Sequence, residues 1–190
     1  MKIIGLAGTF SSGKDTLAKI LTSKFNFVHL STSDIVREIS LAEYGSTDRP
    51  YLQKISNLYR EKFGSDYFVA EAYKRYLALE AQEKGSGLII SGMRSLGEAK
   101  KIKDLGGLLV FVDAPIETRY QRAKQRARDS EVASFEEFRA SEAREWKANY
   151  GSETKHNLKG IQEISDIILD NSGDLDSFVA DAEIKLGLTW

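Results

Sequence analysis

Residues 2–17 read KIIGLAGTFSSGKDTL, and this stretch decides the fold. Lys2–Ala7 is a short apolar run, which is typical of a strand buried on both faces of a sheet. Gly8, Gly13 and Lys14 follow at the spacing of a phosphate-binding loop, G-x-x-x-x-G-K-[ST]. Apolar residues then recur at helical spacing. A loop of this kind between a buried strand and a helix predicts an α/β nucleotide-binding fold, although a Gly/Ser turn with a surface lysine is the alternative.

The predicted loop would bind the phosphates of ATP with its backbone N–H groups and with the positive end of the helix that follows. Lys14 would add a point charge at the terminal phosphates. We therefore expect the nucleotide contacts to come from one run of residues, Gly8, Ser11, Ser12, Gly13, Lys14, Asp15 and Thr16.

Asp15 stands where the motif has a hydroxyl, which moves to Thr16. An acidic residue is favoured in the first turn of any helix. Beside a triphosphate, however, its charge also has to be offset by a cation, and Mg²⁺ is the obvious one. We expect Asp15 to hold the metal directly or through water, with Thr16 facing a phosphate.

The bulk composition is that of a globular protein. The chain has 190 residues, 42% of them hydrophobic and 29% charged, with a formal net charge of -1 and no cysteine. The balanced charge gives no indication of nucleic-acid or membrane binding. The absence of cysteine excludes disulfides and thiolate metal sites. No segment has the length of a signal peptide or membrane span, and we expect a cytoplasmic protein.

Short apolar runs alternate with helical patterns along the whole chain. This order predicts a parallel sheet of five strands inside a three-layer α/β/α sandwich of the P-loop NTPase type. Ligands of such sheets bind beyond the carboxyl ends of the strands. The polar segments expected to converge there are residues 8–16, 31–37, 91–95 and 170–174. The strands are predicted at residues 2–7, 26–30, 87–91, 108–113 and 166–169. Helices are predicted at residues 16–25, 51–63, 66–83, 96–105, about 115–150 with a break near 130–134, and 175–186. The polar cluster at residues 31–34 is expected to cap a further helix that carries Ile35, Val36 and Ile39.

The Gly-Lys-Asp-Thr run at residues 13–16 resembles phage-type deoxynucleoside monophosphate kinases, and adenylate kinases also lack the hydroxyl after the loop lysine. LSTSDIVRE (residues 30–38) is similar to the adenylate-kinase segment in which Ser-Thr-Gly-Asp leads to an arginine. The resemblance implies that Thr32 contacts the acceptor nucleotide, that Arg37 binds its phosphate and that Asp34 lies near the Mg²⁺ waters. Ser33 replaces the glycine of that pattern. The alternative for this segment is an ordinary capping cluster with an exposed Arg37.

SGMRSLGEAKKIKDLGG (residues 91–107) resembles the matching stretch of the phage-type enzymes. The resemblance implies that Arg94 clamps the acceptor phosphate. Those relatives usually carry an acid where this chain has Ser91 or Gly92. Its loss makes Asp15 and Asp34 more important for the metal.

DAPIETRYQRAKQRARDS (residues 113–130) places Arg119, Arg122 and Arg126 on one helical face. In monophosphate kinases lid arginines follow the fourth strand, and Arg122 and Arg126 match their spacing. A solvated charged face is the alternative. SDIILDNSGDL (residues 165–175) resembles the fifth-strand turn of these kinases and of dephospho-coenzyme A kinases. The resemblance implies that Asn171–Gly173 lie beside the adenine of ATP and contact it through backbone groups. A plain strand-to-helix turn capped by Asp174 is the alternative.

Taken together, the resemblance implies one kinase domain over residues 1–190, with a helical acceptor-binding arm at about 33–84 and a lid at about 119–150. It would transfer the terminal phosphoryl group of ATP to a nucleoside or deoxynucleoside monophosphate, as a monomer or homodimer, with ATP and Mg²⁺ as cofactors. Positioning and charge neutralisation carry such a transfer. The residues expected to supply the charges are Lys14, Arg37, Arg94, Arg122 and Arg126.

Two other functions stay open. A dephospho-coenzyme A kinase would phosphorylate a sugar hydroxyl and would need a carboxylate base, for which Asp34 is placed. A nucleotide-dependent switch or regulatory ATPase would have no acceptor and no need of Arg37 or Arg94. Within the arm, Arg49, Asn57 and Arg60 are candidates for reading the base or sugar, or for surface salt bridges. No role is predicted for His29 or His156.

Overall fold

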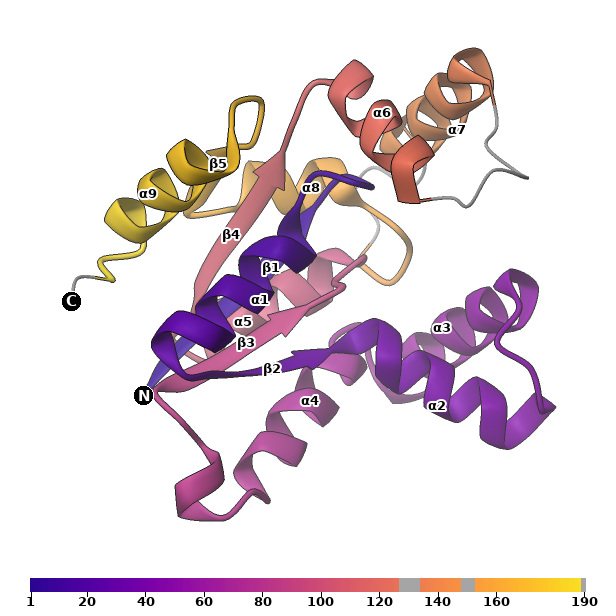
Figure 1. The fold of residues 1–190 in the computed structure, drawn as a ribbon. Helices are drawn as coiled ribbons and strands as arrows, with labels where there is room; N and C mark the ends of the chain where they lie inside the picture. The colour runs from indigo at the N-terminus through magenta and orange to yellow at the C-terminus, as the bar shows by residue number, and fades with distance from the viewer. Residues whose placement is uncertain (127–133, 148–152, 189–190) are drawn as a thin grey trace.

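The computed structural model describes residues 1–126, 134–147 and 153–188 (Figure 1). Its central sheet has five strands, all parallel, in the order β2-β3-β1-β4-β5. This confirms the predicted parallel sheet. The strands are β1 (Lys2–Gly8), β2 (Phe27–Ser31), β3 (Gly87–Ser91), β4 (Leu108–Asp113) and β5 (Ile167–Asp170).

The register of the strands brings their carboxyl ends to one edge of the sheet. Ser91 at the end of β3 pairs with Leu6 of β1 and with Ser31 of β2. On the other side of β1, Gly8 pairs with Val112 of β4, and Asp113 pairs with Asp170 of β5. The polar segments that follow β1, β2, β3 and β5 therefore leave the sheet at the same edge, as the alternation of strands and helices predicts.

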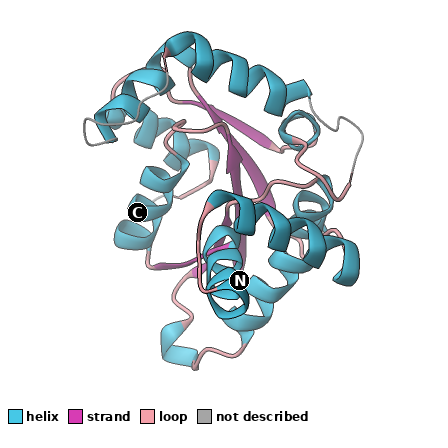
Figure 2. Cartoon of the chain, turned by 90° about the vertical axis from the view of Figure 1, so that its right-hand side faces the viewer, coloured by secondary structure: helices cyan, strands magenta, loops and turns pink. Residues whose placement is uncertain are grey.

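Helices cover both faces of this sheet, which gives three layers (Figure 2). The helices α2, α3 and α4 form the insertion between β2 and β3, and in Figure 1 they project to one side of the sheet. The helices are α1 (Lys14–Phe25), α2 (Thr32–Tyr44), α3 (Arg49–Phe63), α4 (Tyr67–Leu77), α5 (Leu96–Asp104), α6 (Ile116–Arg126), α7 (Phe135–Lys147), α8 (Leu158–Glu163) and α9 (Leu175–Lys185), with a 3₁₀ turn η1 (Ala81–Glu83).

Two local expectations are wrong, and one helix was not predicted. Ser31 precedes α2 without a side-chain capping bond, so the polar cluster at residues 31–34 does not cap this helix. The helix expected at 66–83 ends at Leu77, because Glu80 and Glu83 form a capping box that starts a separate turn. Helix α8 was not predicted. It has 6 residues, which is too short for its apolar spacing to stand out.

Two apolar clusters fill the space between the layers. On one face of the sheet, Leu17 and Leu21 of α1 pack with Phe178 of α9 and with the strands. On the other face, helices α4, α5 and α8 pack against the sheet around Phe68 and Phe111. Strand residues contribute to both clusters, because successive side chains of a buried parallel strand point to opposite faces. The sheet is therefore a rigid base for the loops at its carboxyl edge.

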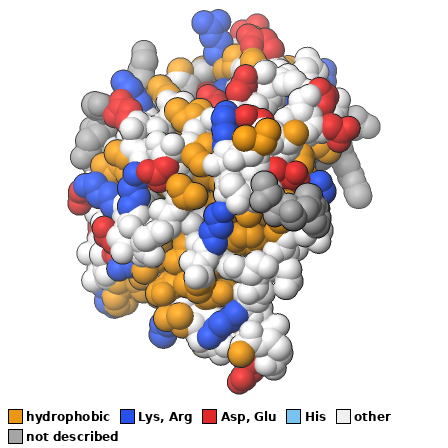
Figure 3. All heavy atoms as spheres, turned by 90° about the vertical axis from the view of Figure 1, so that its left-hand side faces the viewer, with side chains coloured by type: hydrophobic (Ala, Val, Ile, Leu, Met, Phe, Trp, Pro, Cys, Tyr) orange, Lys and Arg blue, Asp and Glu red, His pale blue; other side chains and the backbone are white. Residues whose placement is uncertain are grey.

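The side of the molecule that carries β5 and α9 exposes several apolar side chains (Figure 3). Ile168 on the edge strand β5 is 49% exposed, and Ile184 on α9 is 78% exposed. Throughout the described part of the chain, the helices are too short or too polar to cross a membrane.

Candidate nucleotide and acceptor site

The phosphate loop connects β1 to α1 in a conformation that needs glycine. Gly13 has a φ of 103° and precedes the first residue of α1. A Cβ atom at this position would lie 2.1 Å from Nδ2 of Asn171. Ser11 also has a positive φ, of 59°. Successive residues of this kind turn backbone N–H groups toward one point, which is the geometry of an anion-binding nest.

Two hydroxyl groups inside this loop are buried and lack partners. Ser11 is 3% exposed and Ser12 is 0% exposed, and neither Oγ atom has a hydrogen-bond partner among the described residues. A buried hydroxyl without a partner costs about 1–3 kcal/mol. Phosphate oxygens would accept hydrogen bonds from both groups, so the loop fits the phosphates of a nucleotide.

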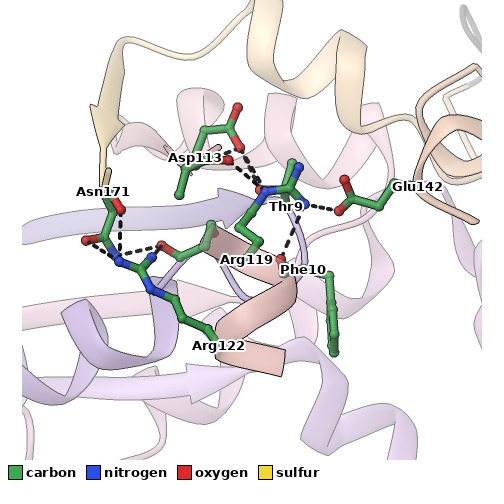
Figure 4. Close-up of polar contacts among 9 residues, drawn as sticks. Thr9, Phe10, Asp113, Arg119, Arg122, Glu142 and Asn171 are labelled. Atoms are coloured by element: carbon green, nitrogen blue, oxygen red, sulfur yellow. Dashed lines mark hydrogen bonds and ion pairs between the residues drawn. The ribbon is translucent and has the colours of Figure 1, made fainter. Parts of the chain in front are cut away.

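A cavity of about 190 Å³ lies beside the loop, lined by Gly13, Thr16, Arg122, Asn171 and Leu175. Asn171 donates from Nδ2 to the Ser12 carbonyl at 2.7 Å, and Nη2 of Arg122 donates to the Asn171 carbonyl at 3.0 Å (Figure 4). The structure thus joins the predicted donor-site residues Thr16, Arg122 and Asn171. The side chain of Asn171 is engaged by the phosphate loop, and its expected backbone contact with adenine stays a prediction. The side chain of Arg126 lies outside the described residues.

Arg119 behaves differently from Arg122, although the sequence places both on one helical face. It is 6% exposed, and its Nε donates to the Ala114 carbonyl at 2.7 Å. The same guanidinium pairs with Glu142 of α7 (Figure 4). Arg119 therefore ties α6 to β4 and α7, and its charge is already matched inside the protein.

The two carboxylates predicted for the metal both lie near His29. Its Nε2 is 2.8 Å from the Ser91 hydroxyl at the end of β3. Burial lowers the pKa of His29, while the negative charges of Asp15 and Asp34 oppose that change. The charges of both carboxylates therefore influence the same imidazole, that of His29, at the carboxyl edge of the sheet. No group of three metal-ligating side chains occurs in the described part of the chain, so phosphate oxygens and water would have to complete the coordination of Mg²⁺.

The loops after β2 and β3 touch each other at Gly92. Thr32 is 2% exposed, and its Oγ1 lies 2.8 Å from where a Cβ at Gly92 would be. The Ser33 hydroxyl lies at the same distance from that point. Any side chain at position 92 would approach these two hydroxyls too closely, and Gly92 also has a φ of 86°, which disfavours other residues.

Asp34 and Arg37 are adjacent on the first turns of α2. Nη1 of Arg37 lies 2.5 Å from Oδ1 of Asp34, and their side chains are 53% and 71% exposed. Both therefore face solvent at the carboxyl edge, where an acceptor can reach them. Their pairing also keeps the Asp34 carboxylate beside a positive charge.

Arg94 follows β3 in a loop that is held from two directions. Its N–H donates to Oε2 of Glu98 at 2.8 Å, and its carbonyl accepts from the Asn157 N–H at 2.8 Å. Oε1 of Glu98 in turn accepts from Nη2 of Arg60 at 2.9 Å. Arg60 is 3% exposed, so its salt bridge is buried and not on the surface as expected. It forms a buried ion pair that links α3 to the loop of Arg94.

His156 lies against the same loop. It forms an isolated antiparallel bridge with Ser95. Burial lowers its pKa to about 4, helped by the positive charges of Arg94, Arg60 and Arg49. The imidazole is therefore neutral at pH 7. The three arginines come from separate segments, and the charge of each opposes protonation of His156.

A second cavity, of about 330 Å³, lies between the phosphate loop and α7. Its lining includes Thr9, Asp113, Ile116, Arg139, Trp146 and Leu158. Thr9 donates from Oγ1 to Oδ1 of Asp113 at 2.7 Å (Figure 4). This cavity was not predicted. Apart from Thr9 of the phosphate loop, its residues come from β4, α6, α7 and α8, and their sequence pattern is that of ordinary helix and strand residues.

Among the site residues that were not predicted, Glu98 is one that a sequence motif could have identified. Ser95 and Glu98 have the spacing of a capping box, and both reciprocal bonds are present. That motif identifies Glu98 as a capping residue. Its second role, as the partner of Arg60, depends on a contact across 38 positions of the chain, which no local pattern reports.

Comparison with known proteins identifies the family. The sequence model of a family described as "AAA domain" matches residues 4–147. A UPF0200 protein of Hyperthermus butylicus is 31% identical over 182 residues, which cover 95% of this chain and 91% of the relative. A UPF0200/UPF0201 protein of Archaeoglobus fulgidus is 28% identical over 182 residues, but the chain spans 53% of that longer relative.

Solved structures show the same fold. TT1252 from Thermus thermophilus has a TM-score of 0.59 at 24% identity, with 100% of this chain and 98% of that chain covered. Shikimate kinase from Bacteroides thetaiotaomicron has a TM-score of 0.60 at 15% identity and coverage of 98% and 99%. A gluconokinase from Sinorhizobium meliloti 1021 has a TM-score of 0.57 at 14% identity and coverage of 98% and 91%. The fold is thus the P-loop kinase-like sandwich, and the chain belongs to the UPF0200 proteins and to the AAA-domain family whose sequence model it matches.

Proposed function

We propose that this protein is an ATP-dependent kinase that transfers the terminal phosphoryl group to a nucleoside or deoxynucleoside monophosphate. The observation that carries the proposal is the phosphate loop. Its buried Ser11 and Ser12 hydroxyls lack partners among the described residues, and phosphate oxygens would supply them. Lys14 is the first residue of α1 and directly follows this loop. Its positive charge and the N-terminus of the helix would therefore both stabilise the same bound anion.

The acceptor side of the proposal rests on the neighbouring loops. Arg37 and Arg94 lie in the segments that follow β2 and β3, whose carboxyl ends are in register at Ser31 and Ser91. Two guanidinium groups suit a dianionic phosphate, because each presents several N–H donors to it. An acceptor phosphate is already ionised at neutral pH, so the reaction needs no general base. In this proposal the chain supplies positioning and charge neutralisation, as phosphoryl transfer generally requires.

ATP and Mg²⁺ are the proposed cofactors. Asp15 and Asp34 would hold the metal or its waters, and Thr16 would face a phosphate. Arg122 would bind the triphosphate from the side of Asn171, since both line the smaller cavity. Small nucleotides are the proposed partners of a monomer or homodimer that works in the cytoplasm, where ATP is available.

Dephospho-coenzyme A kinase is the second candidate, and the exposure of Asp34 favours it. A sugar hydroxyl has to lose its proton during transfer, and an exposed carboxylate in the acceptor loop is a suitable base. The two candidates differ in what Asp34 does. It would organise metal water for a phosphate acceptor, and it would accept a proton from a hydroxyl acceptor.

The test is ADP release by the full chain with Mg-ATP and a panel of acceptors. The panel contains each ribo- and deoxyribonucleoside monophosphate and dephospho-coenzyme A. Stimulation by one monophosphate supports the proposal and names the substrate. Stimulation by dephospho-coenzyme A alone supports the second candidate. Slow hydrolysis that no acceptor changes would contradict both and favour a regulatory ATPase.

Arg94→Ala sharpens this test. If Arg94 binds the transferring group, the variant should lose up to roughly 10³–10⁵-fold in turnover, the range of arginine residues that stabilise this transition state. Arg75→Ala is the matched control, because Arg75 pairs with Glu38 on the surface of the arm. Unchanged turnover in Arg94→Ala would contradict the proposal that Arg94 binds the transferring phosphoryl group.

A further inference from the structure

The position of the cavity of about 330 Å³, beside the phosphate loop, suits a part of the acceptor site. One wall is Thr9, which lies in the phosphate loop itself. Another wall is Leu158, which follows Asn157. The Asn157 N–H donates to the Arg94 carbonyl at 2.8 Å, so this wall is bonded directly to the Arg94 loop. The cavity therefore lies between the segment proposed to hold the phosphates of ATP and the segment proposed to hold the acceptor.

The lining of the cavity combines an aromatic side chain with apolar neighbours. Trp146 is half-buried and meets Phe111 edge to face, with ring centroids 6.4 Å apart and an interplanar angle of 76°. Ile116, Ala143 and Leu158 complete the apolar lining. Because Phe111 belongs to the strand β4 and is fully buried, it limits the movement of the indole. A ring held in this way is a stacking surface for a planar ligand.

The polar groups that line the cavity include both hydrogen-bond donors and acceptors. Thr9 Oγ1 and the Ala114 N–H both donate to Oδ1 of Asp113, and no described residue donates to Oδ2. That oxygen is an acceptor at the cavity wall. Arg139 brings N–H donors from α7, and it has no ion pair with any described residue. Arg119 and Glu142 also line the cavity, but they form an ion pair with each other. An aromatic face beside the Oδ2 acceptor of Asp113 and the N–H donors of Arg139 matches a heterocycle that carries both N–H and carbonyl or ring-nitrogen groups.

We propose that this cavity binds the base of the acceptor nucleotide, stacked on Trp146. The inference rests on the proposed kinase function and adds the place and chemistry of base recognition. It holds for a nucleoside monophosphate and for dephospho-coenzyme A, because both contain a base. The cavity is at the small end of the range of ligand pockets, about 300–1,000 Å³, which suits a base and not a whole nucleotide. The phosphate would extend from it toward Arg94.

The arm offers less for this role. Tyr59 and Tyr67 have ring centroids 5.3 Å apart, and Tyr67 and Phe68 have centroids 5.2 Å apart, so these rings pack on one another. Arg60 bonds Glu98 through Nε and Nη2, and its Nη1 is buried without a partner among the described residues. The aromatic residues named here are therefore engaged in the packing of the arm itself.

Direct binding to Trp146 tests the inference. The chain has two tryptophans, so Trp190→Phe in the full-length protein leaves Trp146 as the single indole. The protein is first saturated with Mg-ADP, which fills the donor site. Adenosine, guanosine, cytidine, uridine and thymidine are then titrated while the emission of Trp146 is recorded. At least one nucleoside should cause a saturable change. Arg139→Ala should weaken it several-fold, and Arg75→Ala should leave it unchanged.

A kinetic measurement supplies the second readout. Trp146→Ala should raise the KM of the acceptor by roughly 5- to 100-fold, which corresponds to the loss of one base–aromatic stack. The KM for ATP should not change, because Trp146 does not line the smaller cavity. A parallel rise of both KM values would show a general structural defect and would count against the inference.

The outcomes separate this inference from the proposed function. If an acceptor stimulates ADP release while no nucleoside changes Trp146 emission and Trp146→Ala retains its acceptor KM, the kinase proposal stands and the base binds elsewhere. If no acceptor stimulates ADP release, the kinase proposal fails. The nucleoside titration still decides whether the cavity binds a base, and a flat titration overturns that claim.

Discussion

Nε and Nη2 of Arg60 lie 3.0 and 2.9 Å from Oε1 of Glu98, in a pair whose side chains are 2% and 0% exposed. The other oxygen of Glu98 accepts the backbone N–H groups of Arg94 and Ser95, at 2.8 and 3.1 Å. One carboxylate thus joins helix α3 of the arm to the loop that presents Arg94. The Ser95 hydroxyl adds a bond to the Ser65 carbonyl at 2.9 Å, so the arm and the loop are connected twice.

Breaking the Arg60–Glu98 ion pair should lower the free energy of unfolding. Arg60→Met leaves an unpaired buried carboxylate, and such a change costs about 3–5 kcal/mol. The double variant Arg60→Met/Glu98→Gln should recover part of the loss, because no buried charge remains. Chemical denaturation measures both. Arg75→Met is the control: it breaks an exposed pair with Glu38 and should cost about 1 kcal/mol or less. Equal costs for Arg60→Met and Arg75→Met would contradict the importance of burial.

His156 should make the protein sensitive to acid. Its pKa is lowered to about 4 in the folded chain, first by burial and then by Arg94, Arg60 and Arg49, against about 6.5 when unfolded. The unfolded state therefore binds the proton more readily. The contribution of neutral His156 to the free energy of unfolding is about 3 kcal/mol in total. It is fully present above about pH 6.5 and is lost as the pH falls toward 4. Denaturation of His156→Gln across pH 4–8 should show a flatter slope than the natural chain. Equal slopes would contradict the burial of a neutral imidazole.

Gly13→Ala should impair nucleotide binding. The new Cβ would lie 2.1 Å from Nδ2 of Asn171 and would push away the side chain that bonds the Ser12 carbonyl. Gly106→Ala is a matched control, because Gly106 also has a positive φ, of 71°, but nothing within 4 Å of the added atom. Both variants should lose about 1–2 kcal/mol of stability from backbone strain. Calorimetric titration with Mg-ADP should detect weaker binding in Gly13→Ala alone.

Asp15→Asn should raise the Mg²⁺ concentration needed for half-maximal activity, if Asp15 helps to hold the metal. Asp176 provides the control, since it too is an acidic residue in the first turn of a helix, α9. Asp176→Asn removes the same interaction with the helix dipole, about 0.3–1 kcal/mol, without touching the site. Magnesium dependence that is unchanged in both variants would assign Asp15 to helix stabilisation alone. ADP release measured over a range of Mg²⁺ concentrations distinguishes the two roles.

Arg119 and Arg122 should differ in their effects, although they are three residues apart on α6. Arg119→Ala removes a buried group that bonds Ala114 and Glu142, so it should lower the midpoint of denaturation clearly. Arg122→Ala should act mainly on the KM for ATP, because Arg122 lines the donor cavity and bonds Asn171 at its edge. The reverse pattern would contradict the assignment of Arg122 to the nucleotide.

The phosphate loop, the five strands and most of the helices could be predicted because their signals are local. The glycine spacing of residues 8–13 and the apolar run of β1 each lie within a few residues. A parallel sheet then brings the loops after its strands to one edge whatever their exact sequence. For that reason Ser91 and the loop of Arg94 were expected near the phosphate loop, and the register of β1 and β3 brings them to it.

Only the tertiary structure decided which charged and aromatic residues act together. Arg119 and Arg122 share a helical face in the sequence, yet one is buried against Glu142 and the other reaches Asn171. Arg60 of α3 forms an ion pair with Glu98 of α5, and Trp146 lines the same cavity as Thr9 and Asp113. The physical reason is the range of the interactions. Backbone geometry and apolar periodicity act between neighbours in sequence, whereas burial, ion pairing and cavity shape depend on residues that only folding brings together.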